Sequence, residues 1–218
     1  MVTRGLPLPL RNALAALAIA ALDDDAAVAA LEWLTHPGGE PPASAQEWLA
    51  RLHLVERGGT ALLDVHAPHA PAAAAHAARA LRAAGAHRAA APPRAADPTT
   101  GAVWRAAALW QERLFFEVHE VLEAEWKTAV GEMRQALQGV IQIAVAYHHL
   151  AHGNLRGART LMTEGRARLE GVASSALPPL DLRALLAATA PWAAAIGAGG
   201  PLPLDAPALV LERHAALP

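Results

Sequence analysis

Apolar residues recur every three or four positions along most of the chain, which is the spacing of helices that bury one face. Before residue 90 this spacing predicts four helices, over residues 12–22, 26–35, 44–52 and 72–83. Ser44, with Glu47 three residues later, is typical of a capping box that opens the third helix. Two short apolar runs around Gly58 and Gly59 predict a two-stranded hairpin after it. Because this order is that of a winged helix, we expect a small winged-helix-like α+β region over residues 1–90.

The helical spacing stops at a stretch that contains Pro92, Pro93 and Pro98 and no large apolar residue. Consecutive prolines cannot continue a helix, so we place a linker over residues 91–101. The chain of 218 residues has room for two small domains. We therefore predict a helical bundle domain over residues 102–196, followed by a tail over residues 197–218 that is rich in Pro and Gly.

Beyond the linker the pattern predicts an antiparallel bundle of three to four helices. They cover residues 104–127, 132–152 and 155–169, with a last helix that begins near Asp181. A short turn at Val130 and Gly131 joins the first two, which are therefore expected to pack as an antiparallel hairpin. The fold class expected for the whole protein is mainly all-α.

The first helix of this bundle places charged residues beside aromatic ones. At about 100° per residue, one face of a continuous helix carries Glu112, Phe115, Phe116, His119, Glu123 and Trp126. The same projection puts Glu117 and Glu120 on the flanks or the far side, where water can solvate them. We therefore expect His119 and Glu123 to point inward.

The second helix is apolar nearly all round, which is typical of a helix in the middle of a bundle. Its polar residues form one stripe that contains Gln138, Gln142 and His149. A buried amide or imidazole without a partner costs about 1–3 kcal/mol. We therefore expect this stripe to face His119 and Glu123 and to form a pocket between the two helices.

Composition narrows the classes of function. Apolar residues make up 54% of the chain, mostly Ala and Leu, which favour helices. The formal net charge of -2 provides no basic field for nucleic acid or an anionic membrane, so neither is expected as a partner. The chain contains no cysteine, which excludes thiolate sites and fits a reducing compartment. We expect a cytoplasmic protein; its partner is left open, with a homo-oligomer among the candidates.

His119, Glu123 and Trp126 form the pattern H-x3-E-x2-W, which resembles the signature of a bacterial and archaeal family known as domain-of-unknown-function family 309. The runs Leu137–Gln142 and His149–Gly157 on the following helices also resemble that family. The resemblance covers about residues 103–186. It implies a small all-helical bundle, and it implies no activity.

Several interpretations of this cluster remain open. The sequence favours a structural network in which His119, Glu123 and Trp126 bond to one another and to the glutamine amides. In that case Glu123→Ala is expected to cost about 3–5 kcal/mol, as for an orphaned buried partner. Alternatively, a divalent metal binds to His119, Glu123 and His149, because His and Glu four residues apart on a helix can chelate an ion. Glu112 or His152 is then an optional fourth ligand.

Two further alternatives involve no metal. Glu123 as a base and His119 or His149 as an acid would suit acid–base chemistry on a small molecule. No Ser, Thr or Cys nucleophile accompanies the cluster, so covalent catalysis is not expected. The other alternative is a protein-interaction module, or weak DNA binding through the N-terminal region. The sequence assigns no reaction and does not decide whether the protein is an enzyme.

Overall fold

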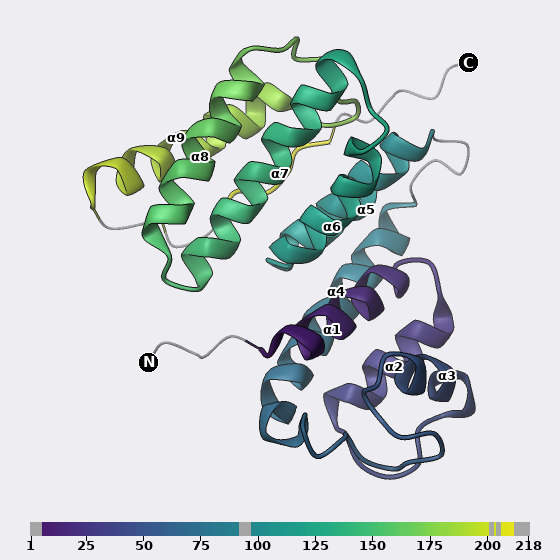
Figure 1. Cartoon of the computed structure of the whole chain (residues 1–218). Helices are drawn as coiled ribbons and strands as arrows, with labels where there is room; N and C mark the ends of the chain where they lie inside the picture. The colour runs from purple at the N-terminus through teal and green to yellow at the C-terminus, as the bar shows by residue number, and fades with distance from the viewer. Residues whose placement is uncertain (1–5, 92–96, 201–202, 204–205, 212–218) are drawn as a thin grey trace. The chain divides into compact units, whose positions relative to one another are not determined.

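A computed structural model describes residues 6–91, 97–200, 203 and 206–211 (Figure 1). Over this part of the chain the secondary structure is nine α-helices and one short 3-10 turn, which confirms the expected all-α class. The contacts within the chain divide it into two units, here called the N-terminal unit (residues 4–91) and the C-terminal unit (residues 92–218).

The N-terminal unit is built from alanine-rich helices around a leucine core. Helix α2 packs against α1, α3 and α4, and α1 also packs against α4. Leu14, Leu31 and Leu49 are among the fully buried side chains, so each of the first three helices contributes to the core. The elements are α1 (Leu8–Ala20), α2 (Asp25–Thr35), α3 (Ala43–Arg51), η1 (Ala67–His69) and α4 (Ala70–Ala90).

Asp24 joins two of these helices. Its carboxylate caps α2 by accepting a bond of 2.7 Å from the backbone N–H of Ala26. Its other oxygen accepts a bond of 3.0 Å from the indole N–H of Trp48 on α3. Hydrogen bonds to the charged form favour it, so the Ala26 N–H and then the Trp48 N–H hold the pKa of Asp24 below its ordinary value.

The winged-helix-like prediction is not supported. Where two strands were expected, the described chain forms a single antiparallel bridge between Val55 and Leu62. The predicted capping box is also wrong, because α3 begins at Ala43 after Pro42 and places Ser44 inside the helix. Gly58 has a φ of 76°, so the glycine turn does form. The flanking runs are too short to extend it into a ladder.

In the C-terminal unit, α7 lies between α6 and α8 (Figure 1). Helix α5 packs against α6, and α9 packs against α8. Asp97 caps α5 through the backbone N–H of Thr100, so residues 98–101 are helical although a linker was expected there. Linker residues 92–96 lie outside the described residues. The helices are α5 (Pro98–Gln111), α6 (Phe115–Trp126), α7 (Gly131–Ala151), α8 (Leu155–Glu170) and α9 (Leu182–Ala198).

The long helix expected over residues 104–127 is broken in two. Arg113 has a φ of 57°, in the left-handed region, and the backbone N–H of Leu114 bonds back to the carbonyl of Leu109. This closes α5 and turns the chain before α6 begins. Neither Gly nor Pro occurs at the break, so the sequence carries no ordinary signal for it. The prediction of one shared face across Glu112 and His119 is therefore wrong.

Aromatic side chains hold the centre of this unit together. Tyr147 of α7 stacks on Phe115 and makes edge contacts with Trp110 and Trp192. The indole of Trp110 donates a bond of 2.6 Å to the carbonyl of Pro207 in the tail. The tail also forms a single bridge to the turn before α9, and the parts of it at 201–202, 204–205 and 212–218 lie outside the described residues.

Glycines let α7 and α8 approach closely. A Cβ built on Gly165 would stand 2.8 Å from the carbonyl oxygen of Gly139 and 2.9 Å from Ile143. A Cβ on Gly139 would stand 2.9 Å from the carbonyl oxygen of Gly165. The two backbones therefore touch at a point where any larger residue would clash.

Among the described residues, no helix is both long and apolar enough to pass through a bilayer.

Candidate functional site

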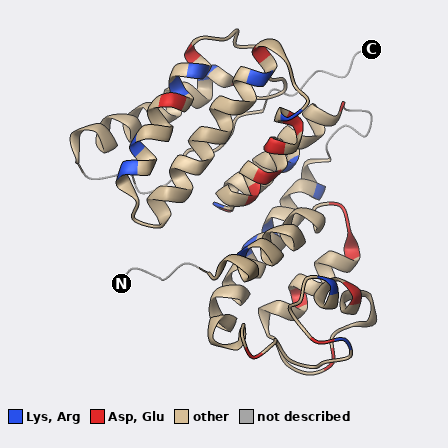
Figure 2. Cartoon of the chain, in the orientation of Figure 1, with Lys and Arg blue, Asp and Glu red and all other residues tan. Residues whose placement is uncertain are grey.

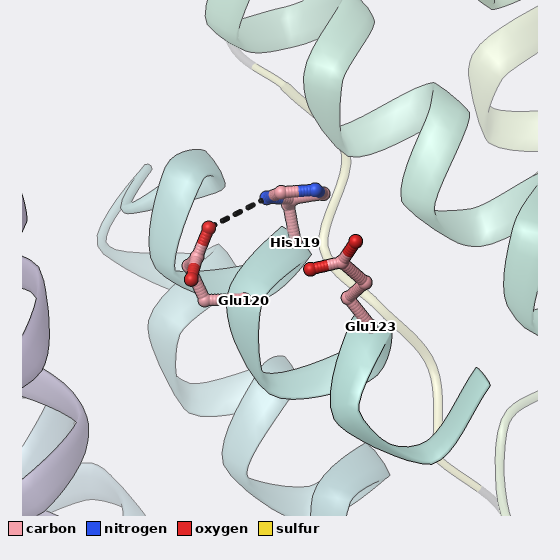
Figure 3. A group of neighbouring side chains, drawn as sticks. All are labelled: His119, Glu120 and Glu123. Carbon is pink, nitrogen blue, oxygen red and sulfur yellow. Dashed lines mark ion pairs between the residues drawn. The ribbon is translucent and has the colours of Figure 1, made fainter. Parts of the chain in front are cut away.

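His119 on α6 lies between two carboxylates of the same helix (Figure 3). Its Nδ1 is 3.2 Å from Oε1 of Glu120, and Glu123 lies on the other side. One candidate ligand atom from each of the three residues can be chosen so that all lie within 4.8 Å of one another. We call these residues the α6 cluster.

The α6 cluster is partly open to solvent. The His119 side chain is 26% exposed, that of Glu123 is 34% exposed and that of Glu120 is 41% exposed. Lys127, one turn later, pairs with Glu123 across 3.3 Å. The cluster is therefore a half-exposed group of charges that water and small ions can reach, so His119 and Glu123 are more exposed than the inward-facing network required.

Gln142, in the glutamine stripe of α7, bonds to α8 and not to the α6 cluster. Gln142 donates a bond of 2.8 Å to Glu164 and accepts one of 3.0 Å from Arg168, both on α8. Gln138 lies one turn earlier on the same stripe and is half-buried. The glycine contact between α7 and α8 turns this face of α7 toward α8, so the predicted pocket between Gln142 and His119 is not formed.

His149 lies in the last turn of α7 and contacts the turn that leads into α8. The side-chain carbonyl of Asn154 accepts from the N–H of Gly157, which fixes the amide so that its NH2 group faces Nδ1 of His149, 3.1 Å away. That nitrogen therefore accepts, and in neutral imidazole the proton lies on Nε2. With one nitrogen bonded and the other protonated, His149 is poorly placed to be the third metal ligand that the sequence predicted.

Two other imidazoles lie closer together at the end of α7. The rings of His148 and His152 have centroids 4.3 Å apart, and Nδ1 of His152 is 2.8 Å from the carbonyl oxygen of His148. Phe116 of α6 contacts both His119 and His148, at centroid distances of 5.9 and 6.0 Å. The phenyl ring thus contacts one histidine of each helix.

The remaining predicted site residues take other roles. Trp126 lies under the guanidinium of Arg134, 4.0 Å from the ring centroid, and its indole N–H has no hydrogen-bond partner among the described residues. The expected bond from Trp126 into the network is therefore absent from this part of the structure. Glu112 caps the end of α5, in the segment before the break, and is not one of the three clustered residues.

Charge is distributed unevenly over the helices of this unit (Figure 2). Helix α6 is acidic, with Glu117, Glu120, Glu123 and Glu125 among its twelve residues and no Lys or Arg. Glu117 is buried, although the helical projection placed it toward solvent. Helix α8 is basic by contrast. The negative charge on α6 favours the approach of cations to the α6 cluster.

An open groove of about 1170 Å³ lies on the N-terminal unit, between α3 and the loop that follows it. Its charged lining consists of Arg51 and Arg57 together with Glu47 and Glu56, and of His53. The two carboxylates offset the two guanidinium groups, so the groove has no strongly basic surface of the kind that binds phosphate backbones.

Sequence reasoning missed two residues. Glu120 was placed on the solvent side, because a helical projection does not show that a long side chain can turn back to its neighbour. His148 was not singled out, although His148 and His152 stand four positions apart, a spacing that places two side chains on one helix face.

No curated protein and no solved structure matches the chain. A family model does match, over residues 103–161, from α5 to the first half of α8. The match contains the α6 cluster and the histidines of α7, and it ends before residue 186, where the resemblance was expected to end. Residues 103–161 therefore match the model of the family described as Domain of unknown function (DUF309).

Proposed function

We propose that the C-terminal unit binds a divalent transition-metal ion through His119, Glu120 and Glu123. The observation that carries this proposal is the grouping of three ligand atoms within 4.8 Å of one another on α6. A bond of about 2.1 Å from each ligand to a shared ion places neighbouring ligand atoms about 3–3.5 Å apart. The 3.2 Å between Nδ1 of His119 and Oε1 of Glu120 fits that separation.

The donor set indicates the class of ion. One imidazole and two carboxylates suit Zn²⁺, Mn²⁺ or Fe²⁺. Because the three side chains are partly exposed, water can fill the remaining coordination positions. Three protein ligands with an open position are the arrangement of catalytic rather than structural zinc centres. We therefore expect the bound ion to carry exchangeable water molecules in addition to the three protein ligands.

The same exposure argues against a purely structural network. Ion pairs between exposed side chains contribute about 0–1 kcal/mol, because water screens them and the side chains lose entropy. A network of this kind would stabilise α6 only slightly. A metal site is compatible with half-exposed ligands. A buried structural network would instead require these charged groups to be desolvated.

Lys127 competes with the ion for Glu123. Its ammonium group is 3.3 Å from Oε2 of Glu123, so an arriving cation must displace it. Removing that charge in Lys127→Met therefore raises the affinity for the metal. A structural role for the cluster predicts no such gain, so this variant separates the two interpretations.

Titration of the metal-free, full-length protein tests the proposal. We expect one equivalent of Mn²⁺ to bind, detected by loss of the free-ion signal in electron paramagnetic resonance, and Zn²⁺ to raise the melting temperature. His119→Ala and Glu123→Gln should abolish both effects, and Lys127→Met should strengthen Mn²⁺ binding. Glu132→Gln, an exposed carboxylate in the first turn of α7, is the matched control and should bind as the wild type does.

Two results would overturn the proposal. One is a melting temperature that does not change with Mn²⁺, Zn²⁺ or Fe²⁺ while no ion binds. The other is Mn²⁺ binding that survives unchanged in both His119→Ala and Glu123→Gln.

A further inference from the structure

The last two turns of α7 carry two imidazoles at the spacing of a helical chelate. His148 and His152 are four residues apart, their ring centroids are 4.3 Å apart, and the ring planes are tilted by 43°. Two histidines at positions i and i+4 share one helix face and can bind the same metal ion, as they do in helical zinc sites. Their spacing and proximity meet the first requirement of a bidentate site.

The hydrogen bond of His152 determines which of its nitrogens is available. Nδ1 lies 2.8 Å from the backbone carbonyl of His148, and a carbonyl oxygen can only accept, so Nδ1 carries the proton. The lone pair of neutral His152 therefore lies on Nε2. A histidine ligand whose other nitrogen donates to a backbone carbonyl is oriented for binding and is made more basic. His149 has the opposite arrangement, with its Nδ1 accepting from Asn154.

The position of the pair at the end of α7 also favours a cation. His152 follows the last residue of a helix of 21 residues, where the final carbonyl groups carry partial negative charge. His152 is exposed and His148 is half-buried, so an ion and its water ligands can approach from outside.

We propose that His148 and His152 form a second metal-binding site, distinct from the α6 cluster and selective for ions that prefer nitrogen ligands. Two imidazole ligands favour Cu²⁺ and Ni²⁺, with Cu²⁺ bound most tightly in this series. Phe116, whose ring contacts both His119 and His148, offers no ligand atom. This inference does not depend on metal binding by the α6 cluster.

The test uses the full-length protein and Ni²⁺ or Cu²⁺ as the probe. We expect His152→Ala to weaken binding of Ni²⁺ about tenfold or more, because a bidentate site becomes monodentate. The Cu²⁺ complex of the wild type should show nitrogen hyperfine coupling in electron paramagnetic resonance. Far-UV circular dichroism checks that His152→Ala keeps its helices, which is expected because His152 is exposed.

Two controls separate this site from others. His36→Ala removes an exposed histidine of the N-terminal unit and should leave Ni²⁺ binding unchanged. Glu123→Gln disables the α6 cluster, which as a His and Glu site would also take Ni²⁺, so the effect of His152→Ala is measured in the Glu123→Gln background. The inference fails if the folded double variant Glu123→Gln/His152→Ala binds Ni²⁺ as tightly as Glu123→Gln does, or if Glu123→Gln alone abolishes Ni²⁺ binding.

Discussion

At the scale of single residues, exposure determines what the α6 cluster can contribute to stability. His119, Glu120 and Glu123 each keep about a quarter or more of the side chain in water. Charges in such positions are screened, and the surrounding water already satisfies them. Their close grouping therefore contributes little to the free energy of unfolding and is available for ligand binding.

Replacing Glu123 measures this directly. We expect Glu123→Ala to lower the free energy of unfolding by less than about 1 kcal/mol, because only the exposed pair with Lys127 is lost. The measurement is urea unfolding of the metal-free protein followed by circular dichroism. A loss of about 3 kcal/mol or more would instead support the buried structural network that the sequence favoured.

Tyr147 presents the opposite case of a fully buried polar group. Its side chain is 2% exposed, and its hydroxyl has no hydrogen-bond partner among the described residues. We expect Tyr147→Phe to leave stability unchanged or to raise it by about 1 kcal/mol at neutral pH, because an unsatisfied buried hydroxyl is removed. A clear loss of stability in urea unfolding would show that the hydroxyl has a partner.

Burial also raises the pKa of Tyr147, because the phenolate would be desolvated. The folded protein then keeps this proton at a pH where the unfolded chain, with an ordinary tyrosine pKa of 10.0, has lost it. Tyr147 therefore destabilises the fold progressively as the pH rises past that value. Unfolding midpoints measured from neutral pH upward should fall less steeply in Tyr147→Phe than in the wild type.

At the scale of helices, the contact between α7 and α8 decides the position of the polar stripe. Gly139 and Gly165 bring the two backbones together, and Gln142 then bonds to α8. The stripe was correctly placed on one face of a long buried helix. The predicted neighbour of Gln142 was wrong. Periodicity identifies the face of a helix but does not say which neighbouring helix covers that face.

A larger residue at this contact should lower the stability of the fold. We expect Gly165→Ala to lower the free energy of unfolding by about 1–3 kcal/mol, because the new methyl group would meet Gly139 and Ile143 at less than 3 Å. Gly101→Ala in α5 is the matched control, since a Cβ there meets nothing within 4 Å. The control should be neutral or slightly stabilising, because alanine favours helices. Equal effects of the two substitutions in urea unfolding would argue against the close contact.

At the scale of the whole molecule, the proposed metal sites both lie in the C-terminal unit. Helices α6 and α7 carry them, and the N-terminal unit folds around its own core of α1–α4. Binding that stabilises one folded unit slows the opening of that unit in particular. The effect of metal on the chain should therefore be local.

Hydrogen exchange can locate this effect. With saturating Mn²⁺, we expect slower exchange of the backbone amides of α6 and of the part of α7 packed against it. Exchange in α2 and α3 should stay the same. Uniform slowing in both units, or slowing only in the N-terminal unit, would contradict binding at the α6 cluster.

The sequence by itself determined the helical class, the positions of most helices and the segment that carries the family resemblance. These follow from local properties: alanine-rich composition, periodic apolar positions and terminating Gly and Pro residues, as at Gly153 and Asn154. Such signals act over a few residues and survive in any tertiary context that buries the same face.

Only the tertiary structure decided which polar groups meet. The break at Arg113 separated Glu112 from His119, and the glycine contact turned Gln142 toward α8. Both outcomes depend on packing between helices, which is set by shape and close approach rather than by the polarity of single positions. Glu120 and His148 differ, because each meets its partner within or next to its own helix.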